Sequence, residues 1–150
     1  MKPFSYIAVA AVTLTATTPN IVLAGENDMT AKFAILSQMY DRFNAKDIDG
    51  VVAMLSEDVS WANGMDGGYE HGHAGIREYW TRQWALVNPH VEPLSFVQAV
   101  DGSIVVEVKQ TIRDGNGNPV EEKGLRDKTV GHIFHFKSGK VTRFDIRDDK

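Results

Sequence analysis

Val59-Ser60-Trp61-Ala62-Asn63 is a short strand-like run with amphipathic helical segments on both sides, and its position sets the architecture. Apolar residues recur at helical spacing before it, over about residues 30–45 and 47–55, and again after it, over about 74–87. The first stripe is Phe33, Leu36, Tyr40 and Phe43 with Met39 beside them, and the last is Ile76, Tyr79, Trp80, Gln83, Trp84 and Val87. Four longer strands follow in the second half. Helices followed by a run of strands predict an α+β domain. We expect a cone-shaped α+β barrel, with three N-terminal helices packed in a curved, mostly antiparallel sheet.

Alternation along the late strands assigns their side chains to an inner and an outer face. In residues 103–113 every second residue is apolar except Gln110, which stands on the face of Ile and Val. In residues 126–137, His132 and Phe134 share the inner face, and in residues 140–147 Phe144 points the same way. Ser138-Gly139 is a hairpin turn between the last two strands.

The first 24 residues differ from the rest of the chain and resemble a secretory signal peptide cut after Ala24. Lys2 is followed by an apolar run over residues 6–14, and small or aliphatic residues precede the cleavage point. A membrane anchor is the alternative, but the run is far shorter than the ~20 residues that span a bilayer. We therefore expect a periplasmic or secreted protein, without stable membrane insertion after cleavage, whose single domain covers residues 25–150.

The amino-acid composition limits the classes of ligand and cofactor that we expect the chain to bind. The 150 residues carry a formal net charge of −4, with 43% hydrophobic and 24% charged residues, so no basic footprint for nucleic acid is present. The chain has no cysteine, which removes disulfides, zinc–thiolate sites and thiol nucleophiles. It also has no glycine-rich phosphate loop, so we expect no cofactor.

Four stretches resemble a known family: FNAKDIDG (43–50), LSEDVSW (55–61), GHAGIREYW (72–80) and FKSGKVTRF (136–144). The chain resembles SnoaL-like members of the nuclear transport factor 2-like, or ketosteroid isomerase-like, superfamily over nearly all of residues 28–147. The resemblance implies the cone fold. It leaves function open, because the superfamily contains isomerases, cyclases, epoxide hydrolases and binding modules.

The catalytic residues of the steroid isomerases are not retained. Their aspartate base corresponds to Asn63, which cannot accept a proton as a carboxylate does. Their tyrosine and aspartic acid donors correspond to Met39 and His132. Steroid isomerisation by that machinery is therefore not expected.

The limonene epoxide hydrolases of this fold differ from the chain as well. Their arginine and two aspartates correspond to Val108, Gln110 and Ile146, and only a helper pair persists, as Trp61 and Asn63. The acid/base pair of SnoaL-type cyclases has no secure counterpart here, so cyclisation is neither favoured nor excluded.

The strand alternation leaves a polar group of three inside the cone: Asn63, Gln110 and His132. An apolar pocket with a few convergent polar groups is the usual form of a small-molecule site. His132 titrates nearest neutrality, so it is the candidate general acid/base. The other candidate ligand-binding residues are Trp61, Trp80, Trp84, Tyr69, Phe134 and Phe144. Each has a structural alternative: His132 as a core histidine, Asn63 as a loop cap, and the tryptophans as core.

The glycine-rich segment 64–73 is pliable and could place Tyr69 over the mouth of the cone. His71 and His73 lie in it, but His-x-His without an arranged third ligand is weak evidence for a metal, and we expect none. His73 fits the start of the third helix better.

Two functions agree with these observations. The first is an exported protein that binds or transforms a small hydrophobic, oxygenated molecule by proton transfer through His132, as an isomerase, cyclase or hydrolase would. The second is a non-catalytic ligand-binding or assembly module that forms a homodimer through the outer sheet face. That face carries mixed charge, including Glu107, Lys109 and Arg143, which predicts a modest polar interface.

Overall fold

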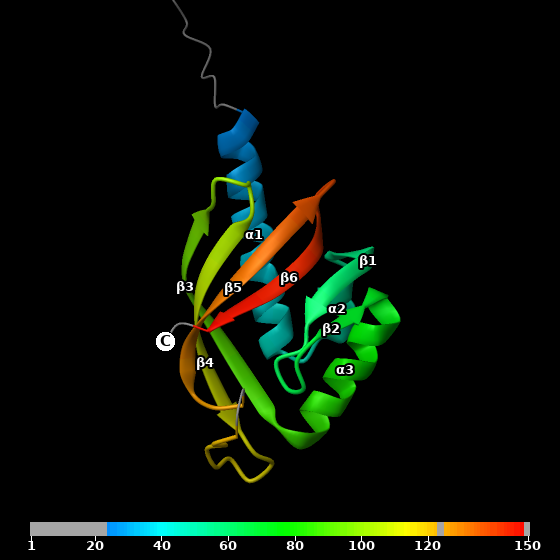
Figure 1. Ribbon diagram of the computed structural model, residues 1–150, viewed down its shortest axis with the longest axis vertical. Coiled ribbons are helices and arrows are strands. Elements are labelled where there is room, and N and C mark those ends of the chain that lie inside the picture. Colours follow the sequence, from blue (N-terminus) through cyan, green and yellow to red (C-terminus); the bar gives the residue numbers. More distant parts are fainter. Residues whose placement is uncertain (1–23, 123–124, 149–150) are drawn as a thin grey trace, which may run out of the picture.

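The computed structural model describes residues 24–122 and 125–148 (Figure 1). Helix α1 spans Ala24–Asn44 and α2 spans Ile48–Val52. The later elements, in chain order, are β1 (Leu55–Ala62), β2 (Tyr69–His71), α3 (Gly72–Leu86), β3 (Asn88–Gln98), β4 (Ile104–Arg113), β5 (Lys128–Lys137) and β6 (Lys140–Asp148). The six strands form one sheet in the order β2-β1-β6-β5-β4-β3. Every neighbouring pair is antiparallel except β1 and β6.

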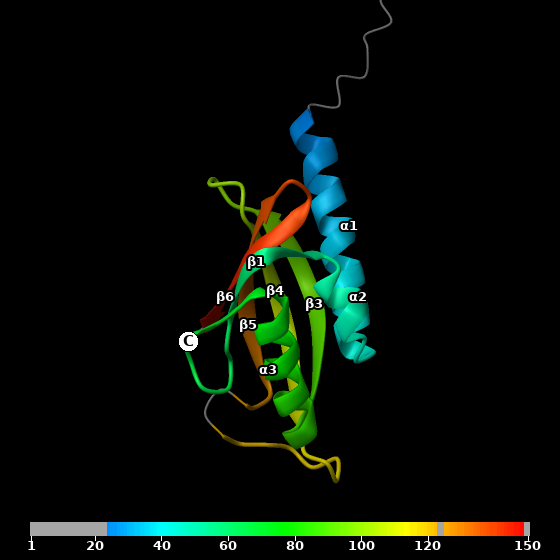
Figure 2. The same ribbon diagram turned by 90° about the vertical axis from the view of Figure 1, so that its right-hand side faces the viewer.

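The sheet is strongly curved, and the helices lie inside its curve. Figure 1 shows α1 running behind the four long strands, with β1, β2 and α3 at the side. Figure 2 shows α1 and α2 on one side of the strands and α3 in front of them. This arrangement confirms the mixed α+β class and the curved sheet, and it is consistent with a cone.

The expected block of three N-terminal helices is only partly found. Strands β1 and β2 precede α3, and α2 is five residues long instead of reaching Leu55. Asp47 caps α2, since its Oδ1 accepts a hydrogen bond from the backbone N–H of Gly50 at 2.9 Å. Leu55 instead begins β1, which is longer than the short run that the sequence predicted and ends at Ala62, one residue before Asn63.

The turns follow from local chemistry. Ser138 and Gly139 have φ of 51° and 78°, the pair of positive values that a tight hairpin between β5 and β6 requires. Gly72 has φ of 71°, and a Cβ there would lie 3.3 Å from the carbonyl oxygen of Glu57. A glycine is therefore needed where the chain passes from β2 into α3.

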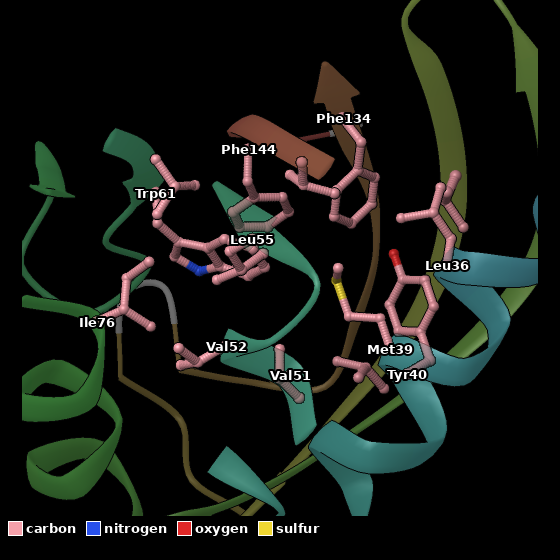
Figure 3. Packing of buried hydrophobic residues seen from close by; sticks show 14 of the residues in the cluster. Leu36, Met39, Tyr40, Val51, Val52, Leu55, Trp61, Ile76, Phe134 and Phe144 are labelled. Atoms are coloured by element: carbon pink, nitrogen blue, oxygen red, sulfur yellow. The ribbon is translucent and has the colours of Figure 1, made fainter. Parts of the chain in front are cut away.

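Most of the core lies between the helices and the inner face of the sheet (Figure 3). Leu36, Met39 and Tyr40 are the buried face of α1, as the helical spacing predicted. The alternation also holds on the late strands, because Ile104, Val106, Val108, Val130 and Phe134 are buried. A smaller cluster of Val87, Ile112 and Leu125 closes the end of the sheet where β4 ends.

The signal-peptide prediction concerns residues 1–24, and residues 1–23 lie outside the described part of the chain. Export and the cleavage point therefore stay predictions. Within the described ranges, no helix is both long and apolar enough to cross a membrane.

Candidate functional site

A cavity of about 80 Å³ lies inside the curved sheet. It sits toward the end where α3 ends and β3 begins, the lower end in Figure 1, and Gln83, Pro89, Ile112 and Leu125 belong to its lining. Its walls are mainly aromatic: Tyr40, Phe43, Trp61, Trp80, Phe134 and Phe144. The volume is about half of the roughly 150 Å³ that holds benzene in an engineered protein cavity. In this state the site suits a molecule smaller than one aromatic ring.

The aromatic walls are fixed by packing among four elements. Trp61 on β1 meets the edge of Trp80 on α3, with ring centroids 5.3 Å apart. Trp61 also lies against Phe144 on β6 at 4.1 Å, and Phe144 meets His132 on β5 at 4.8 Å. Because these rings hold one another, the polar groups between them have defined positions.

The principal polar contact of the cavity is a hydrogen bond between Tyr40 and His132. Tyr40 Oη lies 2.8 Å from His132 Nδ1, and the side chains are 4% and 7% exposed. Figure 3 shows the Tyr40 hydroxyl oxygen directed away from α1 into the interior. A buried tyrosine hydroxyl requires a hydrogen-bond partner, and within the described ranges His132 is that partner for Tyr40 Oη.

This contact determines the tautomer of His132. Tyr40 must donate its proton to Nδ1, because otherwise a buried hydroxyl proton would have no acceptor. The neutral imidazole then carries its own proton on Nε2. Within the described residues, the hydrogen bond of His132 is made through Nδ1, and Nε2 has no partner there. His132 therefore offers one N–H donor to whatever occupies the cavity that it lines.

Burial keeps both groups neutral. Desolvation, assisted by the positive charge of Lys128, lowers the pKa of His132 to about 3. Desolvation also raises the pKa of the Tyr40 hydroxyl well above 10. At neutral pH the imidazole is thus a hydrogen-bond donor and a weak base, not the group titrating near neutrality that the sequence suggested.

A second polar group of the cavity lies on α3. Tyr79 Oη accepts hydrogen bonds from the backbone N–H of Gly64 and from Gln83 Nε2, each at 3.1 Å. Tyr79, Gln83 and Gly64 all line the cavity, and burial raises the pKa of Tyr79 to about 12. The sequence placed Tyr79 and Gln83 on the helical stripe but gave no signal that they belong to a site.

Six of the predicted site residues line the cavity: Trp61, Trp80, Gln110, His132, Phe134 and Phe144. Gln110 was the polar anomaly on its strand, and its Nε2 donates to the carbonyl oxygen of Arg126 at 2.9 Å. The amide nitrogen thus has its partner on the chain that enters β5.

Asn63 lies outside the cavity and lines the polar groove that adjoins it. Its Oδ1 accepts from the backbone N–H groups of Met65 at 2.9 Å and Asp66 at 2.8 Å, and its Nδ2 donates to Glu70 Oε1 at 3.1 Å. The predicted strand alternation fails here because β1 ends at Ala62. The side chain instead holds the loop that follows.

Trp84 and Tyr69 also lie outside the cavity, and Tyr69 lines the adjoining groove. Trp84 packs against Phe43, with ring centroids 5.4 Å apart, and under the ammonium of Lys46 at 5.0 Å. Tyr69 is 42% exposed. Its hydroxyl binds Asp145 and accepts from Arg143 at 2.8 Å, so it is held at the surface and does not cover the cavity.

The two loop histidines make separate contacts. His71 Nδ1 lies 3.2 Å from Ser60 Oγ. His73 lies in the first turn of α3, as expected, and its Nε2 is 2.9 Å from the carbonyl oxygen of Leu55. The pair therefore does not converge on one point.

A polar groove of about 510 Å³ adjoins the cavity. The two spaces share Ala62, Gly64, Gln110 and Ile146 as lining residues. The groove adds charged side chains to the apolar walls, namely Asp66, Lys128, Asp145 and Asp148. A ligand longer than the cavity would therefore pass from apolar to polar surroundings.

The family model described as SnoaL-like domain matches residues 36–144. No curated protein matches the chain significantly. Among solved structures, the fold is similar to a nuclear transport factor 2-like protein of unknown function from Burkholderia pseudomallei. That protein is 24% identical, with 79% of this chain and 91% of that chain covered and a TM-score of 0.65.

Two further structures have the same fold. TerC, co-crystallised with polyporic acid, is 24% identical over 79% of this chain and 92% of its own, with a TM-score of 0.66. A protein with a ketosteroid isomerase-like fold from Catenulispora acidiphila, in complex with trimethylamine, is 14% identical over 77% of this chain and 85% of its own, with a TM-score of 0.61. These similarities establish the architecture.

Proposed function

The chain belongs to the SnoaL-like domain family, and on that premise we propose that it is an exported protein that binds a small, largely apolar molecule through an oxygen atom. The observation that carries the proposal is the Tyr40–His132 hydrogen bond inside an aromatic cavity. It leaves Nε2–H of a neutral imidazole as the donor available to a ligand. Proteins of similar fold hold polyporic acid and trimethylamine, which supports small-molecule binding.

The ligand group that suits this donor is a carbonyl or another oxygen acceptor. In a water-poor aromatic cavity a neutral N–H donor is worth more than in water, because few competing partners are present. Donation from His132 would polarise a carbonyl and stabilise negative charge developing on its oxygen. Any turnover of the isomerase, cyclase or hydrolase type would use this polarisation. Proton uptake by His132 itself would be opposed by its low pKa.

The proposal is tested with butan-2-one, a ketone small enough to match the cavity, added to the mature chain. We expect the NMR signals of the His132 ring to shift on titration, and His132→Leu to weaken ketone binding by about threefold to tenfold. His90→Gln, which removes an exposed histidine of β3, serves as the control. Equal ketone affinity in wild type and His132→Leu would contradict the proposal.

Export is supported by Lys2, by the apolar run over residues 6–14 and by Ala24 at the expected cleavage point. Expression of the full chain in a bacterial host followed by cell fractionation tests it. We expect a periplasmic or secreted product that begins at Gly25. A product that keeps its first residues and stays with the cytoplasmic fraction would remove this part of the proposal.

The small cavity supports a second candidate, a module that assembles without catalysis. A cone filled mainly by its own side chains needs no ligand, and the outer face of the sheet would then be the functional surface. That face presents exposed charges of both signs, including Glu107, Lys109 and Arg143. Light scattering across a range of salt concentrations tests it: a dimer that dissociates with salt agrees, and a monomer at all concentrations opposes it.

A further inference from the structure

Gln83 on α3 is a buried polar residue that the proposed function does not use. Its side chain is 8% exposed and lines the cavity. Gln83 Nε2 donates to Tyr79 Oη, but Gln83 Oε1 is fully buried without a hydrogen-bond partner in the described part of the chain. An unsatisfied buried carbonyl is unfavourable, and a leucine of similar volume would avoid it. Stability of the fold alone therefore does not explain a glutamine at this position.

Turning the amide over does not remove the problem. Tyr79 Oη already accepts the N–H of Gly64, so a reversed amide would let Tyr79 donate to Oε1. That orientation satisfies Tyr79 as donor and acceptor, but it leaves Nε2 of Gln83 without its present partner. In either orientation one end of the amide needs a further polar group.

In this structure the unpartnered end of the amide does not open into the cavity, so a ligand reaches it when the side chain turns toward the cavity that it lines. A hydroxyl group then satisfies both orientations. It donates to Oε1 in the first case and accepts from Nε2 in the second. A carbonyl would serve only the second, and a methyl group neither. The chemistry at Gln83 therefore differs from that at His132, which offers a donor alone.

We propose that Gln83, positioned by Tyr79, is a second polar contact of the cavity, which selects ligands that carry a hydroxyl in addition to the oxygen bound by His132. The inference rests on the proposed function, because it assigns the ligand of the same cavity. The ligand class is a short hydroxycarbonyl compound. The cavity of about 80 Å³ limits the part held inside, and a longer ligand extends past Gly64 and Gln110 into the polar groove.

The test compares three probes of equal heavy-atom count by NMR titration of the mature chain. Hydroxyacetone carries both groups, butan-2-one carries only the carbonyl, and 2-methylpropan-1-ol carries only the hydroxyl. We expect hydroxyacetone to bind about threefold to tenfold tighter than each of the others. The side-chain amide signals of Gln83 should shift with the two hydroxyl probes and not with butan-2-one.

The variant Gln83→Leu separates a ligand contact from a structural role. We expect it to bind hydroxyacetone and butan-2-one equally, and its denaturation midpoint, measured alongside, separates this loss of preference from a loss of the fold. Gln98→Leu, at an exposed position of β3, is the matched control and should keep the preference. Tyr79→Phe, which removes the group that positions the amide, should reduce the preference and gives a second variant.

Each outcome of these experiments either supports or overturns the assignment of Gln83. Equal binding of hydroxyacetone and butan-2-one by wild type overturns the inference, as does a preference that survives in Gln83→Leu, and the wild-type comparison needs no variant to fold. If butan-2-one shifts His132 while the hydroxyl adds nothing, the proposed function stands and the assignment of Gln83 falls. If none of the probes binds, both fall together.

Discussion

Removing the Tyr40 hydroxyl is the sharpest perturbation of the site that leaves its packing intact. Tyr40→Phe keeps the ring that meets the edge of Phe134 at 6.1 Å and deletes only the oxygen that lies 2.8 Å from His132 Nδ1. In the variant, Nδ1 becomes a buried acceptor without its donor, or the imidazole changes tautomer and withdraws the Nε2–H donor from the cavity. The first result lowers the stability of the fold, and the second removes the hydrogen-bond donor that we propose for the ligand.

The magnitude follows from burial. Tyr40 and His132 are 4% and 7% exposed, so water does not readily replace the lost hydrogen bond. A buried polar group left unsatisfied costs about 1–3 kcal/mol, and we expect Tyr40→Phe to lower the free energy of unfolding by that amount. Replacing both partners removes the orphaned group. The double variant Tyr40→Phe/His132→Leu should therefore be about 1–2 kcal/mol more stable than the sum of the single changes predicts.

Urea denaturation of the four proteins of this cycle measures the effect. Tyr69→Phe is the matched control, since Tyr69 is 42% exposed and its lost contacts to Asp145 and Arg143 are replaced by water. We expect that control to stay within about 0.5 kcal/mol of wild type. The reasoning is refuted if Tyr40→Phe costs no more than Tyr69→Phe, or if the cycle is additive.

Three further perturbations follow from the structure. The pKa of His132 is about 3 when folded against 6.5 for the free side chain, so the unfolded chain binds the proton first as the pH falls. Denaturant titrations should show a stability loss that starts near pH 6.5 and amounts to about 2–3 kcal/mol by pH 4.5, above the range in which the carboxyl groups protonate; it should be absent in His132→Leu and retained in His90→Gln. Asn63→Ala should cost about 1–2 kcal/mol by releasing its loop, yet leave butan-2-one affinity unchanged; weaker ketone binding would return Asn63 to the site. Gly72→Ala should lower the free energy of unfolding by about 1–2 kcal/mol because of its positive φ, and Gly115→Ala, with open space around it, by less than about 0.5 kcal/mol; equal costs would show that φ does not matter there.

The periodic signals predicted the inner faces well, because they depend only on local geometry. The burial of His132 and Phe134 followed from alternation along β5, and that of Leu36 and Tyr40 from helical spacing on α1. The contact between Tyr40 and His132 could not be found this way. The residues are 92 positions apart, and nothing in the spacing of either says which side chain faces the other. The available signal was chemical: a tyrosine on a buried stripe needs a partner for its hydroxyl.

The predicted site residues that do not line the cavity lie elsewhere for equally local reasons. The sequence analysis extended the strand alternation from Trp61 to Asn63. Strand β1 ends between these residues, and the side-chain amide of Asn63 instead binds the backbone of the following loop. Trp80 and Trp84 share a helical stripe and their rings stack at 5.8 Å, but Trp84 lies one turn further along α3, where it packs against Phe43 and Lys46. Sequence periodicity predicts which side chains share one face of a helix or strand. It does not predict which of those side chains reach the cavity.

The most direct measurement of the central claim is the protonation state of the His132 imidazole, by ¹⁵N NMR of its ring nitrogens across a pH titration, with and without butan-2-one. The account predicts a neutral ring at neutral pH, with the proton on Nε2 and Nδ1 as the acceptor from Tyr40, and an Nε2 signal that shifts when the ketone is added. A ring that titrates near pH 6.5, or that carries its proton on Nδ1, would contradict the account.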